Sequence, residues 1–246
     1  MSAYPKPSDI GGTLIRRVVA QFKERDFRLP FEQPLLIAVS GGVDSMVLAH
    51  LIGTYGRRIA DRSRITLLHF DHQWREESST IERAAVEELA RVLGVGFESV
   101  TLETQRQNSL SKNLEEDARF KRNAYYSSRS TQATSFAYVL TAHHADDVVE
   151  TLVWRFFRGE LFEQSEGILF QDNNVLRPFL KVTKDEILEY ARAENVPYHD
   201  DPTNQDPMQM RAFFRQELKP ILLKQFPGFR TSVLRYTAKR KNNHKK

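Results

Sequence analysis

The sequence has 246 residues, of which 40% are hydrophobic and none is cysteine, and its formal charge is +4. A chain of this length can bury a hydrophobic core in one large domain or in a domain with a small annex. The lack of cysteine excludes disulfides, iron–sulfur clusters and thiolate zinc sites, which favours a cytoplasmic location but would also suit an organelle matrix or stroma. No apolar segment approaches the roughly 20 residues that a membrane-spanning helix needs, and the first residues lack the pattern of a signal peptide, so we expect no membrane partner.

After a disordered start up to residue 9 and a helix predicted at 10–27, the strongest signal is the stretch from Leu35 to Ala49. Five apolar residues ending at Val39 predict a strand buried on both faces. Ser40, Gly41 and Gly42 then predict a turn, and helix-forming residues follow. Adjacent glycines permit close backbone approach, and the free N–H groups at the start of the helix favour an anion. We therefore predict a phosphate-binding loop.

Other readings of this loop fit less well. A Walker loop requires a lysine, and no lysine occurs between Lys23 and Lys112. The dinucleotide-binding fingerprint requires a third glycine, and its spacing does not fit the sequence around Asp44. An ordinary Ser-Gly-Gly turn is the structural alternative. The loop instead resembles the pyrophosphate loop, or PP-loop, of the ATP pyrophosphatases, which cleave ATP between its α and β phosphates, and the residues that carry this resemblance are Ser40, Gly41, Gly42, Val43, Asp44 and Ser45.

Strands and helices continue to alternate after the loop. Further strands are predicted at 65–70, 96–102 and 136–141, and helices at 46–52, 79–93, 114–126, 184–194 and 210–218. The polar segment 103–113 is too long for a mere connection. This order predicts an α/β fold with a doubly wound, Rossmann-like parallel sheet in residues 1–180, followed by a small C-terminal helical subdomain with a basic tail in residues 181–246.

Polar clusters follow two of these strands, at the edge where open parallel sheets bind ligands. Asp71 and His72 follow the strand at 65–70. After the strand at 136–141, a helix begins with Asp146 near its N-cap and with Asp147 and Glu150 three residues apart on one side.

The adjacent residues His143 and His144 precede these carboxylates. Neighbouring histidines point apart and lack the spacing of a helical zinc site, so zinc is the weaker interpretation, and a purely structural capping role is a further alternative.

Two pairs of arginines lie at helical spacing, Arg119 with Arg122 and Arg211 with Arg215. Such pairs are most often surface charge, but beside a nucleotide loop they become candidates for phosphate contacts. Between the two pairs, residues 199–204 form a turn rich in side-chain acceptors.

The charge is unevenly distributed. From Lys219 to Lys246 there are nine basic and no acidic residues, so this stretch carries +9, whereas the preceding residues carry −5. Such a division predicts an acidic enzyme body with a basic arm for a polyanion. Phe226, Phe229 and Tyr236 lie among the basic residues, as in nucleic-acid-binding segments. For residues 239–246 alone, a solubilising tail is an equal alternative.

Taken together, residues 35–229 resemble the catalytic half of the tRNA(Ile)-lysidine synthetase family. The resemblance rests on the PP-loop, on Asp71-His72-x-x-Arg75, on the run at 141–151, and on Asp201-Pro-Thr-Asn204 followed by Arg211. Members of this family use ATP to adenylate the C2 carbonyl of the wobble cytidine in an isoleucine tRNA, and lysine then displaces AMP. The resemblance implies ATP and Mg²⁺ as cofactors, and tRNA(Ile) with a CAU anticodon and free L-lysine as partners.

The resemblance also implies roles for individual residues. ATP would contact Ser40, Gly41, Gly42, Val43, Asp44, Ser45, Asp71 and His72, with Asp44 also on the metal. The catalytic residues would be Asp44, His143, Asp147 and Arg211. The substrates would contact Asp147, Glu150, Arg119, Arg122, Asp201 and Asn204.

The sequence departs from the family pattern in four places. The glycine-rich stretch after the third motif survives only as Gly159 and Gly167, and Ala212 and Phe213 replace the usual residues after Arg211. Valine stands where glutamine is common before Glu150-Thr151, and the chain ends soon after the catalytic half. These departures concern tRNA recognition more than adenylation.

Three other functions fit parts of the sequence less well. A tRNA thiolase generally relies on cysteines, which this chain lacks. An amide ligase would bring an ammonia-producing partner or a dimer interface, and the sequence leaves a homodimer open. A nucleotide-binding module without chemistry would be favoured by loss of Asp44, Asp147 or Glu150, and all three are present.

Overall fold

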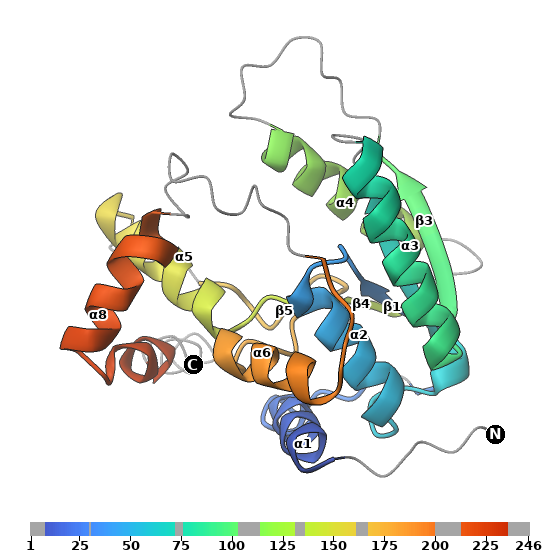
Figure 1. Cartoon of the computed structure of the whole chain (residues 1–246), viewed down its shortest axis with the longest axis horizontal. Helices are drawn as coiled ribbons and strands as arrows, with labels where there is room; N and C mark the ends of the chain where they lie inside the picture. Colours follow the sequence, from blue (N-terminus) through green and yellow to red (C-terminus); the bar gives the residue numbers. More distant parts are fainter. Residues whose placement is uncertain are drawn as a thin grey trace.

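The structure is a computed structural model, and it describes residues 8–29, 31–71, 76–102, 114–130, 136–160, 167–199 and 213–235. A six-stranded sheet forms its centre, in the order β3-β2-β1-β4-β6-β5 (Figure 1). The strands are β1 (Leu35–Ala38), β2 (Ile65–Asp71), β3 (Gly96–Thr101), β4 (Tyr138–Leu140), β5 (Gln171–Asp172) and β6 (Val175–Leu176). All neighbours are parallel except β5 and β6, which are antiparallel.

Helices occupy most of the remaining described residues. They are α1 (Asp9–Lys23), α2 (Val43–Tyr55), α3 (Glu76–Leu93), α4 (Leu114–Ser130), α5 (Ala145–Phe157), α6 (Lys184–Ala193) and α8 (Lys219–Gln225). Shorter turns are η1 (Arg62–Arg64) and η3 (Phe214–Leu218), and residues 229–235 are also helical. No helix among the described residues has the length and apolar character required to cross a membrane.

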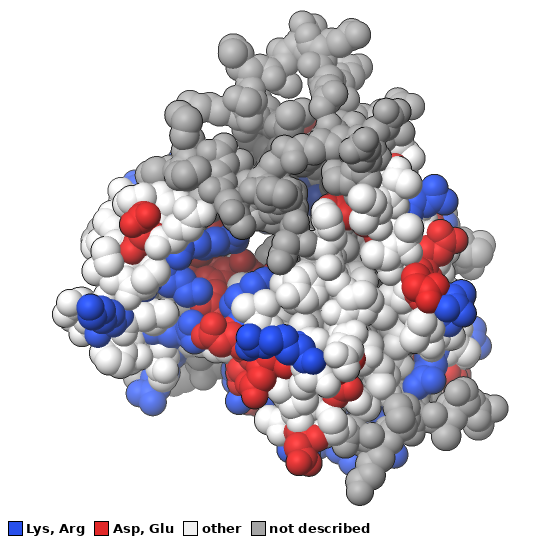
Figure 2. Space-filling model, viewed as in Figure 1, with Lys and Arg blue, Asp and Glu red and all other residues white. Residues whose placement is uncertain are grey.

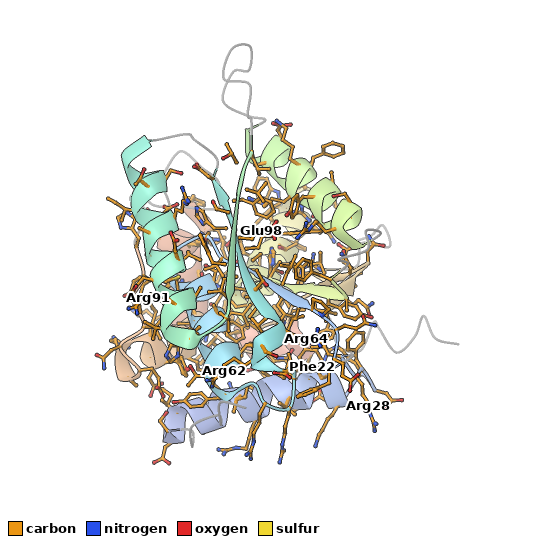
Figure 3. The ribbon with its side chains drawn as sticks, turned by 90° about the vertical axis from the view of Figure 1, so that its right-hand side faces the viewer. Phe22, Arg28, Arg62, Arg64, Arg91 and Glu98 are labelled. Atoms are coloured by element: carbon orange, nitrogen blue, oxygen red, sulfur yellow. The ribbon has the colours of Figure 1, made fainter. Side chains whose placement is uncertain are left out.

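Helices cover both faces of the sheet, which confirms the doubly wound α/β fold. Side chains alternate along β1, so Leu35 and Ile37 join one core with α1, α2, α3 and α6, whereas Leu36 joins a second core that includes Tyr126 of α4. Glu98, labelled on β3 in Figure 3, accepts a hydrogen bond from Tyr125 and pairs with Arg129 at 3.0 Å, so α4 is also anchored to the sheet by polar contacts.

The first helix begins earlier and ends earlier than predicted. Its N-cap is Ser8, whose hydroxyl accepts a hydrogen bond from the N–H of Gly11 at 3.0 Å, so the prediction of disorder up to residue 9 is wrong for residues 8 and 9. The helix ends at Lys23 because Asp26 adopts a left-handed conformation, with φ of 50°, which breaks the helical ladder before Phe27.

The hairpin of β5 and β6 was not predicted as a pair of strands. Each strand has only two residues, and Asn173 turns between them with φ of 52°. Two residues are too few to show an alternating hydrophobic pattern.

The C-terminal region begins as part of the main core. Ile187, Tyr190 and Ala191 of α6 are buried in the core cluster that contains α2. The helix predicted at 210–218 is a π-helical turn at 214–218 that continues into α8, while its first residues lie outside the described part. The division of the chain at residue 180 stays a prediction.

Candidate active site

The loop after β1 has a defined backbone geometry. Gly41 has φ of +92°, a conformation that side chains disfavour, and a Cβ there would lie 3.0 Å from Cβ of Glu82 on α3. The N–H of His199 donates to the carbonyl oxygen of Gly41 at 3.0 Å, and the hydroxyl of Ser45 donates to that of Gly42 at 3.0 Å. Because Gly42 is the N-cap of α2, the loop lies at the positive end of a helix, as an anion site requires.

Asp44 lies in the first turn of α2 and contacts two cationic or ionisable groups. Its Oδ1 is 2.6 Å from Nζ of Lys184, and its Oδ2 is 3.7 Å from Nε2 of His144. Burial acts to raise the pKa of Asp44, but the hydrogen bonds and charges of His144 and Lys184 outweigh burial and leave the pKa below its usual value. Asp44 is therefore ionised near neutral pH.

The start of α5 lies beside Asp44. Its N-cap is His144 and Asp146 is the second residue of the helix, which confirms the prediction that Asp146 lies near the N-cap. Its carboxylate accepts a hydrogen bond from the backbone N–H of Lys184 at 2.8 Å and so joins α5 to α6. Burial lowers the pKa of His144, but Asp44 and Asp147 outweigh it, so the pKa lies above its usual value.

His143 contacts different partners from His144. Its Nδ1 lies 3.1 Å from the hydroxyl of Thr141. Burial, with the positive charges of Arg177 and Arg119, lowers the pKa of His143 to about 4 despite the opposing charge of Asp147. The imidazole is therefore neutral at pH 7, and the charge of Arg119 on α4 reaches this part of the site.

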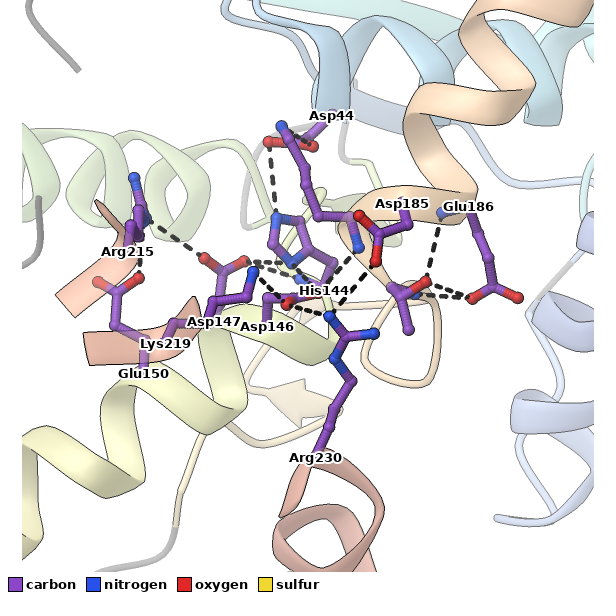
Figure 4. A network of polar contacts seen from close by, with 12 residues as sticks. Asp44, His144, Asp146, Asp147, Glu150, Asp185, Glu186, Arg215, Lys219 and Arg230 are labelled. Atoms are coloured by element: carbon purple, nitrogen blue, oxygen red, sulfur yellow. Dashed lines mark hydrogen bonds and ion pairs between the residues drawn. The ribbon is translucent and has the colours of Figure 1, made fainter. Parts of the chain in front are cut away.

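Asp147 and Glu150 project from the same side of α5 toward Arg215 (Figure 4). Nε of Arg215 is 2.8 Å from Oε2 of Glu150, and its Nη2 is 3.7 Å from Oδ1 of Asp147. The side chain of Glu150 is 8% exposed, that of Asp147 22% and that of Arg215 45%. The predicted carboxylate pair therefore exists, and a guanidinium bridges it.

Two residues of the basic C-terminal stretch also contact the site. Lys219 and Arg230 approach Oδ1 of Asp146 at 2.6 and 3.0 Å, and Arg230 also lies 3.5 Å from Asp185. Figure 2 shows basic and acidic side chains gathered in the region between α8 and α6. Two of the nine basic residues in the predicted basic arm are thus paired with carboxylates of the site.

The remaining predicted site residues are less closely connected. The carboxylate of Asp71 accepts a hydrogen bond from Ser79 and so ties the end of β2 to α3. The positive charge of Arg122 acts to lower the pKa of Tyr126 in the second core, against the larger effect of burial. His72, Asp201, Asn204 and Arg211 lie outside the described residues. Within the described part of the chain, no group of three or more His, Asp or Glu side chains is arranged to hold a metal ion.

From the sequence, His144, Asp146 and Arg215 could be named as candidates, and Lys219 and Arg230 lie in the predicted basic arm, but nothing indicated that they meet in one cluster. Lys184 was not identified as a site residue. The Thr183-x-x-Glu186 capping box marks the start of α6, so the sequence could locate Lys184 at the first position of a helix. No signal in the sequence indicates that this helix start faces Asp44.

A loop of this kind at the carboxyl edge of a parallel sheet, with an ionised aspartate in the next helical turn, defines an α/β nucleotide-binding protein. The PP-loop domain model matches residues 13–222, so the chain belongs to the PP-loop family of ATP-binding domains.

Several curated relatives of this chain are named tRNA(Ile)-lysidine synthase. A protein of Thermus thermophilus is 35% identical over 223 residues, which are 90% of this chain and 42% of that protein. The protein of Chlorobaculum tepidum is 31% identical over 193 residues, which are 78% of this chain and 57% of that protein. The chain thus spans about half the length of these relatives.

A solved structure gives the fold comparison. The U34-tRNA thiolase NcsA from Methanococcus maripaludis, solved with its [4Fe-4S] cluster, superposes with a TM-score of 0.71 at 18% identity, covering 94% of this chain and 78% of that one. At this identity the likeness supports the fold alone, and it agrees with the predicted PP-loop architecture.

Proposed function

We propose that this chain carries the catalytic machinery of a ligase that joins lysine to C2 of the wobble cytidine in AUA-decoding tRNA(Ile), through an adenylated tRNA. One observation carries the proposal. His144 lies 3.7 Å from Asp44 of the PP-loop and 3.5 Å from Asp147 of the carboxylate pair, so the PP-loop and the carboxylate pair are close enough to serve one reaction. The similarity to relatives with this name supports it.

The nucleotide part of the site rests on the loop. Backbone N–H groups and hydroxyls of residues 40–45 suit a pyrophosphate at the start of α2. Mg²⁺ prefers one or two carboxylates together with phosphate oxygens and water, and Asp44 offers such a carboxylate. Bound there, the ion would neutralise phosphate charge. Asp71 and His72 are proposed to contact the nucleotide. Arg119, Arg122 and Arg211 are proposed to contact phosphates or the reacting centre.

The lysine part of the site rests on the carboxylates. Free lysine carries two ammonium groups, and Asp147 and Glu150 supply negative partners for them. In the transfer step the attacking nitrogen bonds to C2, the bond from C2 to the adenylated oxygen breaks, and AMP leaves with that oxygen. The attacking amine also loses a proton, and the imidazole of His143, which is neutral at pH 7, is the proposed acceptor.

The tRNA must present a base that has left its stack before C2 can meet the α-phosphate. Phosphate contacts from Lys224, Arg235 and the basic residues after them would position the anticodon stem. Asp201 and Asn204 are proposed as further substrate contacts.

The test is to incubate the protein with ATP, labelled lysine and a transcript with a CAU anticodon. A second transcript in which the wobble cytidine is replaced is the control. Label only in the first transcript is the expected result. Label in both or in neither would contradict lysidine formation and favour another adenylating enzyme of the PP-loop family.

A further inference from the structure

The PP-loop of this chain has no basic residue of its own. Residues 40–45 contain one carboxylate and no lysine or arginine. A triphosphate that enters this loop meets backbone N–H groups and the helix dipole, but also the negative charge of Asp44. In Walker loops a lysine next to the loop contacts the phosphates. In this chain a lysine 140 residues further along the sequence reaches the same place: Nζ of Lys184 is 2.6 Å from Oδ1 of Asp44.

The backbone of Lys184 is held by contacts that do not involve its ammonium group. Thr183 and Glu186 form a reciprocal capping box, in which the carboxylate of Glu186 accepts the N–H of Thr183 at 2.9 Å. The N–H of Lys184 itself donates to Asp146 of α5 at 2.8 Å. Contacts within α6 and with α5 thus fix the backbone of Lys184, while its ammonium group lies against the first turn of α2. Figure 4 shows the partners Asp44, Asp146 and Glu186.

The ion pair is partly exposed, since the side chain of Lys184 is 30% exposed and that of Asp44 is 33% exposed. Ion pairs with this exposure contribute little to stability. The contact is therefore better explained by where it places a positive charge than by the fold it supports. The ammonium lies beside the first turn of α2, 2.6 Å from Oδ1 of Asp44, so we expect it to reach an anion bound at the start of that helix.

We propose that Lys184 is the phosphate-binding cation of this PP-loop, supplied from α6 and held by Asp44 while no nucleotide is bound. This assignment rests on the proposed use of ATP. Asp44 would be the residue that holds a magnesium ion, and the ammonium of Lys184 would then pair with a phosphate oxygen of ATP in place of that carboxylate. The exchange keeps both charges paired, so it avoids the cost of leaving the carboxylate without a cation.

The test compares nucleotide affinities of the full chain by calorimetry, with ATP and Mg²⁺ and separately with adenosine. Lys184→Met should weaken ATP binding roughly 10- to 100-fold, as loss of a charged hydrogen bond predicts, and should change adenosine affinity less than about twofold. Lys184→Arg should restore part of the ATP affinity. The matched control is Lys181→Met, since Lys181 precedes the same helix but pairs with Glu24, away from the loop; it should bind ATP as the wild type does.

The outcomes are distinct. Unchanged ATP affinity in Lys184→Met, or equal losses for ATP and adenosine, would overturn the assignment. If the methionine variant does not fold by circular dichroism, Lys184→Gln takes its place. Lysine transfer to the CAU transcript is measured in parallel: wild-type protein that binds ATP through Lys184 but transfers no lysine would contradict only the proposed function. Transfer by the wild type, with full ATP affinity in Lys184→Met, would contradict only the role of Lys184.

Discussion

Replacing Glu150 with glutamine removes one negative charge from the proposed lysine site and keeps the size of the side chain. Glu150 is 8% exposed, so its interaction with an ammonium group is only weakly screened by solvent. A hydrogen bond to a charged group contributes roughly 1.5–3 kcal/mol, and about 1.4 kcal/mol corresponds to tenfold in affinity. We therefore expect the apparent KM for lysine to rise roughly 10- to 100-fold, while that for ATP changes less than about twofold.

The assay is steady-state transfer of labelled lysine to the CAU transcript, with lysine and ATP varied separately. The matched control is Glu160→Gln, which removes the same charge just beyond the end of α5, where Glu160 pairs with Arg158 at 2.7 Å. The control should leave both KM values unchanged. Thermal unfolding checks that Arg215, which retains Asp147 as a partner at 3.7 Å, still holds η3 against α5.

Two results would refute the reasoning. An equal rise in both KM values would mean that Glu150 supports the whole site rather than lysine. A lower kcat with an unchanged KM for lysine would place the carboxylate at the reacting centre instead.

Three further predictions concern the loop and its neighbours. Asp44→Asn should reduce ATP-dependent pyrophosphate release at least roughly 100-fold if the metal and the reacting phosphate both depend on this carboxylate, and unchanged release would contradict its assignment. The pKa of His144 is raised in the folded protein, so its contribution to stability is complete below about pH 6.5 and is lost as pH rises through the folded-state pKa. The pKa of Asp44 is lowered, so this carboxylate stays ionised down to below about pH 4. The difference in melting temperature between wild type and His144→Asn should therefore be largest at about pH 4.5–6.5, and a constant difference up to pH 9 would contradict the pairing. Gly41→Ala should destabilise the protein by about 1–3 kcal/mol, because φ is +92° and Glu82 lies in the way, and urea unfolding measures this.

Much of the fold could be predicted because its signals are local. Strand β1 is a continuous apolar run, as a central parallel strand should be, and the mainly apolar β2 is interrupted only by Thr66 and His69 before it ends at Asp71. The end of α1 could not be placed, since the left-handed turn at Asp26 depends on Phe27 packing back against Phe22, with ring centroids 6.0 Å apart. The β5–β6 hairpin is likewise defined by pairing with β4 and not by its own sequence.

The site likewise has a part that the sequence predicts and a part that depends on packing. The loop at residues 40–45 and the carboxylates of α5 are contiguous motifs, so their residues could be named in advance. Their partners Lys184 and Arg215 come from other elements, and only the packing of those elements brings them within 2.6 Å of Asp44 and 2.8 Å of Glu150. The roles of His72, Asp201, Asn204 and Arg211 stay predictions, because these residues lie outside the described part of the chain.

The contacts of Lys219 and Arg230 change how the basic C-terminal stretch should be tested. Both residues neutralise Asp146, and Asp146 in turn holds the N–H of Lys184 beside the PP-loop. Removing everything after Leu218 would leave a carboxylate that is 8% exposed without its cations, at a cost in stability that reaches the ATP site. A loss of tRNA binding in such a truncation would therefore have two causes. A better test uses charge-removing substitutions at Lys224 and Arg235, because these two side chains are not among the contacts of Asp146. If they bind tRNA phosphates, the double variant should weaken tRNA binding and reduce its salt dependence while ATP affinity stays at the wild-type value. A parallel loss of ATP affinity would mean that the whole stretch belongs to the folded site and that the RNA is bound elsewhere.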